Sequence, residues 1–277
     1  SSYGSGFPVD FAFYRKPAAS DDWWTVARLI QGKELKANTA VTEASWSGAT
    51  FDSNDSWGTN AQDNTYQSWM WKRHAGMDVV TYGGDGTAGR SKQHSLGKVP
   101  EMIWIKGRFA ENWLAWHYGL NNGTDSWQYA LELNNNQAEV SYGYQSAAPT
   151  AKDFSIGTHG MVNESGKYYM AMLFTSIDGV SKCGYYDGSA SDLTIQCGFQ
   201  PRFVIIKSTT TAGYSWVVLD SLRTWGSGND NYLQLNSNAA EVSYEMGAPT
   251  SSGFTVDAGS AWVNGSTARK YIYYAHA

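Results

Sequence analysis

The chain has 277 residues, of which 42% are hydrophobic, 15% aromatic and only 16% charged, and it contains 29 glycines. This composition supports a buried core and favours short strands joined by turns over helices. The net charge of -5 and the lack of any Lys/Arg run argue against a nucleic-acid partner, and no apolar stretch reaches the roughly 18 residues of a membrane-spanning helix.

The first 75 residues predict an incomplete copy of a repeat that recurs twice further along the chain. Strands are expected at residues 11–15 and 67–71. Trp24 stands four residues before Arg28 and is assigned as the tryptophan of the repeat. The opening strand of the other copies is missing, and residues 1–6 look like a linker or a cut end. We therefore expect the chain to be a C-terminal piece of something longer.

Two fuller copies follow, each opening with a strand, at residues 78–82 and 181–186. The run Ala-Glu-Val-Ser-Tyr occurs in both copies. Other matched features are a Pro-to-Lys strand, a tryptophan four residues before a polar residue, a Leu-x-Leu-Asn strand and an aromatic closing strand. They lie at residues 100–106 and 201–207, Trp113 and Trp216, 131–134 and 233–236, and 168–174 and 271–275. We expect three tandem domains, at residues 1–75, 76–178 and 179–277.

Apolar residues within each copy occur in short runs bounded by Gly, Asn, Asp, Pro and Ser, which indicates strands. Residues 102–105 are apolar at every position, which is typical of a strand covered on both faces, as between two packed sheets. About 100 residues with seven or eight short strands match an antiparallel β-sandwich or a jelly roll. The sequence thus predicts an all-β chain of tandem, independent sandwiches, each with its own core.

The third copy shows the repeat most fully, with Gly-Phe-x-Pro at residues 198–201, then Lys207, Trp216 and Asp220, and Ser-Gly-Phe at residues 252–254. In these motifs the chain resembles the tandem domain of tail-fibre-like proteins from marine bacteriophages and related prophages. Departures from that pattern are His117 and Arg28 in place of Asp220, and Trp57 in place of Phe254. The resemblance covers nearly the whole chain. It implies a lectin-like sandwich fold in a virion appendage and assigns no catalytic residue.

Sequence motifs for catalysis or metal binding are lacking. The five histidines are not spaced as metal ligands, and neither a nucleophile elbow nor a phosphate-binding loop occurs. Glu43, Glu139 and Glu241 recur once per copy, which favours a structural role over a pair of glycosidase carboxylates. The Asp-Gly pairs at residues 85–86 and 187–188 indicate hairpin turns rather than calcium loops. We expect no enzyme activity, no cofactor and no bound metal.

The chain has two cysteines, Cys183 and Cys197, so a disulfide scaffold is excluded. The two residues lie in segments that we expect to be neighbouring strands, so a disulfide between them is within reach. A pair of small buried thiols is the simpler interpretation, and the sequence leaves the choice open.

The two longer loops that follow the repeated tryptophan are the candidate binding site, because each adds one further tryptophan to Asn, Asp and Ser. A sugar ring presents an apolar face for stacking and hydroxyls that short amide and carboxylate groups can bridge. The predicted ligand contacts are Trp127, Asn121, Asn122 and Asp125 in the second copy, and Trp225, Asn229 and Asp230 in the third. The alternative is that these tryptophans fold over the sandwich edge or contact a neighbouring subunit.

From these observations and the resemblance we expect a non-catalytic module of a bacteriophage tail fibre or similar appendage, located in the virion and extracellular. Its partners would be a host-surface glycan or other receptor and other virion proteins, and the fibre would be a homotrimer whose avidity strengthens weak contacts. The alternative is a purely structural spacer or decoration domain of a fibre or capsid. A polysaccharide depolymerase is the third hypothesis.

Overall fold

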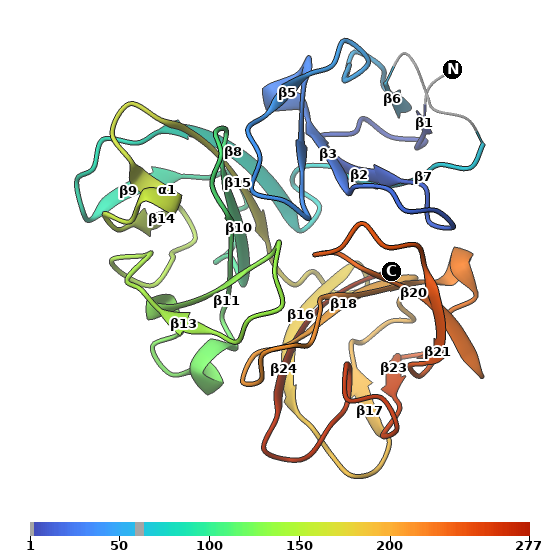
Figure 1. Cartoon of the computed structure of the whole chain (residues 1–277). Coiled ribbons are helices and arrows are strands. Elements are labelled where there is room, and N and C mark those ends of the chain that lie inside the picture. Colours follow the sequence, from blue (N-terminus) through green and yellow to red (C-terminus); the bar gives the residue numbers. More distant parts are fainter. Residues whose placement is uncertain (1–2, 59–63) are drawn as a thin grey trace.

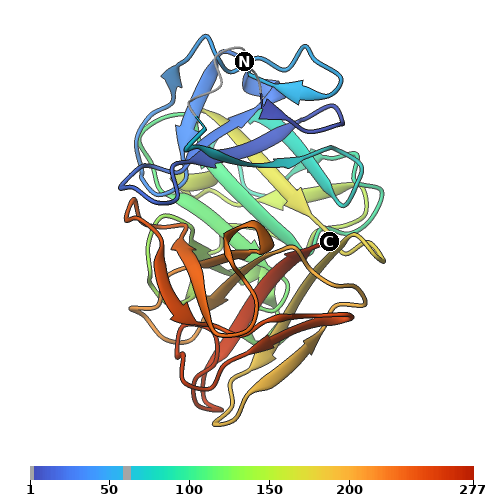
Figure 2. The same ribbon diagram turned by 90° about the vertical axis from the view of Figure 1, so that its right-hand side faces the viewer.

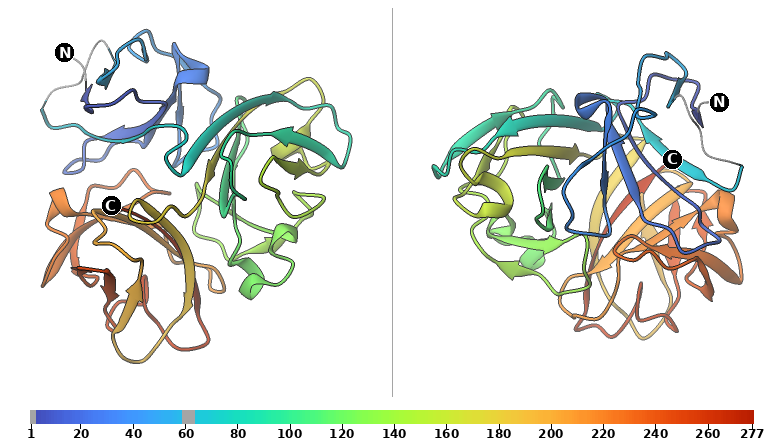
Figure 3. Two further views of the ribbon diagram at one scale, coloured as in Figure 1. Left: turned by 180° about the vertical axis from the view of Figure 1, so that it is seen from behind. Right: turned by 45° about the horizontal axis from the view of Figure 1, so that its top comes forward.

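The computed structural model describes residues 3–58 and 64–277 and shows a nearly all-β protein built from antiparallel sheets. Three lobes surround a common centre, each with one large sheet and one small sheet (Figures 1 and 3). We refer to residues 3–71 as lobe 1, residues 77–174 as lobe 2 and residues 181–276 as lobe 3. The all-β, antiparallel sandwich class predicted from the sequence is confirmed.

Lobe 1 has a five-stranded sheet in the order β5-β4-β3-β2-β7 and a two-stranded sheet of β1 and β6. The elements are β1 Tyr3–Gly4, β2 Phe11–Arg15, β3 Trp24–Ala27, η1 Arg28–Ile30, β4 Lys33–Lys36, β5 Ala44–Ser45, β6 Ser56–Trp57 and β7 Gln67–Trp71.

Lobe 2 has a six-stranded sheet in the order β13-β12-β11-β10-β15-β8 and a small sheet of β14 and β9. The elements are β8 Met77–Gly83, β9 Arg90–Gln93, β10 Met102–Gly107, β11 Trp113–His117, η2 Leu120–Gly123, η3 Ser126–Gln128, β12 Tyr129–Glu132, β13 Val140–Ser141, β14 Asp153–Ile156, α1 Gly160–Asn163 and β15 Tyr168–Phe174.

Lobe 3 has a six-stranded sheet in the order β16-β24-β18-β19-β20-β21 and a small sheet of β17, β23 and β22. The elements are β16 Ser181–Asp187, β17 Leu193–Gln196, β18 Phe203–Ser208, β19 Val217–Asp220, η4 Ser221–Arg223, β20 Asn229–Gln234, β21 Val242–Glu245, β22 Pro249–Thr250, β23 Gly253–Val256 and β24 Lys270–His276.

The central strands of the large sheets are buried on both faces. All residues of β2, β10 and β18 are buried. In β2, Phe11 and Phe13 belong to the cluster at the centre of the molecule, whereas Ala12 and Tyr14 pack towards the small sheet of the same lobe. Because neighbouring side chains of a strand point to opposite faces, such a strand must be apolar throughout. The prediction for residues 102–105 is confirmed.

The inner faces of the three large sheets form one shared core. Its largest cluster contains buried residues from every lobe. The ring centroids of Phe13 and Trp104 are 5.8 Å apart across lobes 1 and 2, and those of Phe174 and Tyr274 are 5.0 Å apart across lobes 2 and 3. Lobes 1 and 3 also hold a buried cluster of their own, between the large and the small sheet. The expectation that the copies are independent of one another is therefore wrong, whereas a core of its own is present in lobes 1 and 3. The three domain ranges themselves stay a prediction.

One buried tryptophan in each lobe donates an indole hydrogen bond to the backbone of another lobe. Each acceptor is the carbonyl oxygen of the last residue of β4, β12 or β20. These residues occupy equivalent places in the three sheets. The bonds run from Trp23 Nε1 to Gln234 O at 2.9 Å, from Trp113 Nε1 to Lys36 O at 2.8 Å, and from Trp216 Nε1 to Glu132 O at 3.1 Å. Lobe 1 thus donates to lobe 3, lobe 3 to lobe 2, and lobe 2 to lobe 1, so the ring is closed.

These bonds correct the assignment of the repeated tryptophan in lobe 1. The backbone N–H groups of Trp113 and Trp216 donate to an asparagine side chain of the same lobe, and Trp23 does the same with Asn38. Trp23, and not Trp24, is therefore the equivalent residue. A shift of one residue along a strand moves a side chain to the other face of the sheet, so Trp24 lies on the outer face.

Each lobe also buries one cation at or near the end of its central strand β2, β10 or β18: Arg15, Lys106 or Lys207. Their hydrogen-bond acceptors are backbone carbonyls. Arg15 donates to Ser237, Asn238 and Ala239 of lobe 3, Lys106 to Gly107 and Phe109, and Lys207 to Ser208. Arg15 thus ties lobe 1 to lobe 3. Burial lowers the pKa of Lys106 to about 8 and that of Lys207 to about 7.

The closed ring predicts a cost for removing one indole N–H. In Trp113→Phe the carbonyl of Lys36 loses its buried donor, which costs about 1–2 kcal/mol beyond the loss of packing. Trp104→Phe is the matched control, because Trp104 is equally buried and its Nε1 has no partner among the described residues. We expect urea unfolding to show Trp113→Phe as the less stable variant by that margin, and equal losses in the two variants would contradict it.

The buried lysine predicts a pH-dependent stability. The pKa of Lys207 is about 7 in the folded protein, whereas an unfolded lysine titrates at about 10.4. Between these values the unfolded chain binds more protons, so the free energy of unfolding should rise as the pH rises from about 7 to about 10.

We expect Lys207→Met to flatten this rise in urea unfolding measured at several pH values. The exposed Lys152 provides the control, since Lys152→Met should leave the slope unchanged. A wild-type slope in Lys207→Met would show that the ammonium is not desolvated as the fold implies.

Candidate functional site

A half-buried aromatic pocket opens on the outer face of the large sheet of lobe 1. It has a volume of about 270 Å³. Its lining residues come from three adjacent strands and from the segments beside them: Tyr14 in β2, Trp24 in β3, Glu34 in β4, and Asp21, Trp46 and Tyr66 outside the strands. We call these six residues the aromatic pocket. Neighbouring strands bring Tyr14, Trp24 and Glu34 together, because these residues share the outer face.

Tyr14 forms the floor of the aromatic pocket and is only 2% exposed. Its ring is near parallel to that of Trp46, at 5.4 Å between centroids and 27°, and to that of Trp24, at 6.3 Å and 21°. The Tyr14 hydroxyl donates to Glu34 Oε2 at 2.8 Å. Trp24 Nε1 donates to Asp21 Oδ1 at 3.2 Å, which fixes the orientation of the indole.

Two lysines lie beside the aromatic rings of the pocket. Lys36 Nζ lies 4.4 Å from the ring centroid of Trp24, and Lys16 Nζ lies 4.9 Å from that of Tyr66. Burial raises the pKa of the Glu34 carboxyl, and the hydrogen bond from Tyr14 opposes that rise. Burial and the nearby Glu34 also raise the pKa of the Tyr14 phenol far above its usual value. Tyr14 therefore keeps its proton and donates to Glu34, and the carboxyl group of Glu34 has a second oxygen that can accept from a further polar group.

The aromatic pocket is specific to lobe 1, although its backbone positions recur in every lobe. The pair Tyr14–Trp24 is replaced by aliphatic pairs in the other two sheets, and Glu34 by an uncharged residue. The equivalent residues are Ile105 and Leu114 with Ala130 in lobe 2, and Ile206 and Val217 with Tyr232 in lobe 3. Features that recur in all lobes hold the fold, so a polar, aromatic exception at equivalent positions points to a local function.

The loop of residues 120–128, predicted as a binding site, turns through three polar residues with left-handed backbone conformations. Asn121, Asn122 and Asp125 adopt positive φ angles of 49°, 55° and 46°, a conformation that Asn and Asp tolerate better than most residues. Asn121 also donates from its side chain to Thr124 O at 2.7 Å. Turn geometry therefore explains these short polar residues. Asn122 and Asp125 are exposed, and Trp127 is half-buried.

The second predicted loop, residues 223–230, turns its tryptophan inwards. Trp225 is only 4% exposed and packs against Phe254. Asp230 is fully buried, and its carboxylate accepts from the backbone N–H groups of Gly226 and Met246. Burial raises the pKa of Asp230 to about 6. Of the predicted contacts in this loop, Asn229 alone is exposed.

The structure does not bring the two predicted loops together. They belong to lobes 2 and 3 and lie far apart in both views of the ribbon (Figures 1 and 3). The repeated glutamates are engaged in hydrogen bonds within and between lobes. Glu43 pairs with Arg108 of lobe 2 at 2.6 Å, Glu139 accepts from the backbone of Asn121, and Glu241 lies 3.4 Å from Arg223. These contacts agree with the structural role expected for the three residues.

The described residues offer the site no metal ligands and no disulfide. They hold no cluster of three or more His, Cys, Asp or Glu side chains placed to bind a metal. Cys183 and Cys197 are not joined by a disulfide. Within residues 3–58 and 64–277, no helix has the length and apolar character needed to cross a membrane.

Tyr14, Glu34, Trp46 and Tyr66 were not predicted from the sequence, because Trp24 was assigned to the core. The signal was the adjacent pair of tryptophans at 23 and 24, of which only one can face the shared core. With Trp23 in the core, Trp24 is left as an outward aromatic residue in a strand whose counterparts carry aliphatic ones.

Comparison with known proteins places the chain in a family. Residues 26–277 match the family described as a domain of unknown function, DUF7483. Neither curated proteins nor solved structures give a match. The matched residues include all of lobes 2 and 3 and most of the large sheet of lobe 1. The chain therefore belongs to the DUF7483 family.

Proposed function

We propose that this chain is a non-catalytic module that binds a surface glycan through the aromatic pocket of lobe 1. The observation that carries the proposal is that the rings of Tyr14, Trp24 and Trp46 lie beside the half-buried carboxyl group of Glu34. This combination occurs in one lobe out of three. A glycan needs an apolar surface for its ring and fixed acceptors for its hydroxyls, and the aromatic pocket offers both.

The dimensions of the pocket favour a small unit of a larger ligand. Its volume of about 270 Å³ lies just below the usual range of about 300–1,000 Å³ for small-molecule sites. One or two sugar units at the end or along the side of a polysaccharide would suit this space. Affinity at one such site would be weak, and several copies in one assembly would raise it by avidity.

The proposed setting is a bacteriophage tail fibre or similar appendage, extracellular in the virion, with other virion proteins as partners. This setting rests on the resemblance of the repeat to tail-fibre-like domains of marine bacteriophages. A homotrimeric fibre would present three aromatic pockets to one cell surface. The glycans of a bacterial host are then the natural ligand class.

The rival function is a structural spacer within the same kind of appendage. Its support is that the tryptophans shared by all lobes, and Trp225 of the second predicted loop, serve packing. A spacer requires no ligand, so an array of bacterial surface glycans separates the two functions. Binding of no glycan by the whole chain would favour the spacer, and new reducing ends in the bound glycans would instead indicate a depolymerase.

The proposal predicts which tryptophan matters. For a glycan that binds on the array, Trp46→Ala should weaken binding about ten-fold, because loss of ring stacking is worth about 1.4 kcal/mol. Glu34→Gln should weaken binding as well, since a charged acceptor is lost. Affinity is measured by titration of the whole chain with the glycan.

The control is Trp127→Ala, which removes the half-buried tryptophan of the loop first predicted as the site. We expect it to leave the affinity unchanged. Loss of binding in Trp127→Ala with full binding in Trp46→Ala would place the site in that loop and refute the assignment to the aromatic pocket.

A further inference from the structure

The large sheet of lobe 1 ends in an open edge. β7 pairs with β2 and, among the described residues, with no second strand. Its counterparts β15 and β24 each have a second antiparallel neighbour, β8 in lobe 2 and β16 in lobe 3. Alternate residues of a strand direct their backbone groups to opposite sides, so about half of those on β7 face away from β2.

In lobes 2 and 3, the outermost strand also fills the space against the preceding lobe. Val79 and Val80 of β8 line the same hollow as Leu29 of η1 in lobe 1. Tyr185 of β16 packs edge-on against Tyr118 of lobe 2, with centroids 5.4 Å apart. β8 therefore lies between β15 of lobe 2 and the turn after β3 of lobe 1. In the same way, β16 lies between β24 of lobe 3 and the turn after β11 of lobe 2.

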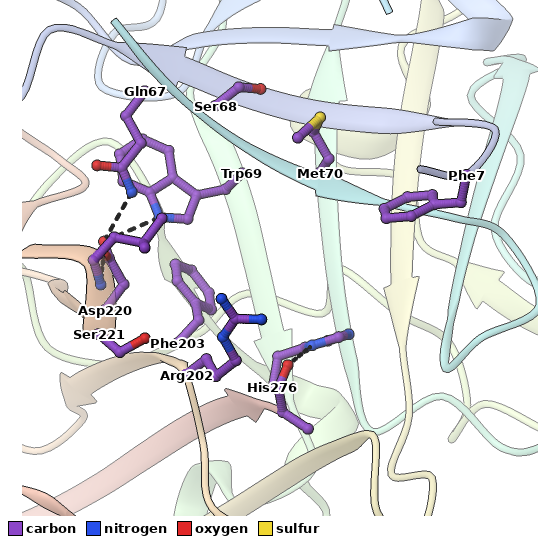
Figure 4. Close-up of a pocket in the computed structure, with 12 residues that line it drawn as sticks. Phe7, Gln67, Ser68, Trp69, Met70, Arg202, Phe203, Asp220, Ser221 and His276 are labelled. Carbon is purple, nitrogen blue, oxygen red and sulfur yellow. Dashed lines mark hydrogen bonds between the residues drawn. The ribbon is translucent and has the colours of Figure 1, made fainter. Parts of the chain in front are cut away.

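The third equivalent place is a groove between β7 and η4 of lobe 3, with a volume of about 290 Å³. Its lining residues come from lobes 1 and 3 and include Ala277. Figure 2 shows the C-terminus at the level where these two lobes meet. Trp69 and Phe203 line it, and Asp220 accepts hydrogen bonds from Gln67 and Trp69 beside it (Figure 4). We call this space the edge groove.

The high exposure of Leu222 indicates that no strand covers it in the edge groove. It is 75% exposed, whereas Leu29, at the matching position in the turn η1, is 42% exposed next to β8. An aliphatic side chain so exposed beside an unpaired strand edge provides the two features of a site for strand addition: backbone partners and an apolar anchor.

We propose that the edge groove binds an extended peptide segment, which adds antiparallel to β7 as a sixth strand and covers Leu222. The two strands in the equivalent places define its chemistry. β8 buries its first three residues and β16 buries Ser181, Cys183 and Gly184, and both become more exposed towards the end. Apart from Asp78, whose carboxylate pairs with Arg73, these buried residues are small or apolar. The occupant is therefore a strand with mainly small or apolar side chains in its first half. This peptide site is separate from the aromatic pocket and does not depend on it.

The test uses a capped synthetic peptide with the sequence of residues 76–84, which includes β8, and the whole chain. We expect saturable binding, together with slower hydrogen exchange of the β7 amides. A peptide of the same composition in scrambled order should give neither effect. No binding, or protection confined to strands other than β7, would overturn the proposal.

Two matched variants locate the peptide. Leu222→Asp should weaken binding about ten-fold or more, since a charge replaces the apolar anchor. Leu29→Asp changes the same residue type in the turn already beside β8 and should leave the affinity within about two-fold of the wild type. Equal weakening by the two variants would refute the edge groove. A chain that instead dimerises through β7 and ignores the peptide would show that a second copy occupies the edge.

Discussion

The fold depends on three buried indole N–H groups, each of which requires a hydrogen-bond acceptor. Trp23, Trp113 and Trp216 lie in the shared core, where an unpaired donor costs about 1–3 kcal/mol, and each finds its acceptor in the backbone of another lobe. The acceptor carbonyl is correctly placed only when the neighbouring sheet is folded. Lobes that might have been separate domains are thereby made parts of one cooperative unit, in which Arg15 adds a further link between lobes 1 and 3.

This constraint acts on the inner faces of the sheets and leaves the outer faces free to differ. Lobes 2 and 3 use the outer positions equivalent to Tyr14 and Trp24 for aliphatic packing under the small sheet. Lobe 1 instead opens a pocket there, which Glu34 lines together with the rings. The proposed binding site is compatible with this scaffold, because the shared core holds all three lobes while the outer face of one lobe differs.

Much of the fold could be predicted from the sequence, and the reasons for the errors are physical. Alternating and fully apolar runs identify strands and show which are covered on both faces, as in residues 102–105. They do not show what covers a face, so the core shared between the lobes was not predicted beside the cores within them. Trp23 and Trp24 are identical neighbours whose side chains point to opposite faces of the sheet. Because Trp24 was assigned to the core, the aromatic pocket was not predicted. Trp225 was a candidate ligand contact, with packing over the sandwich edge as the alternative, because a loop sequence does not reveal which way its aromatic residue turns.

Hydrogen exchange resolved to β3, β11 and β19 tests most directly whether the three lobes form one unit. These strands hold or adjoin the three tryptophans of the ring, one strand in each lobe. A shared core predicts that the slowest amides of all three strands open with the same free energy, equal to that of global unfolding, and respond alike to urea. Three different opening free energies, with one lobe exchanging while the others stay protected, would contradict the account.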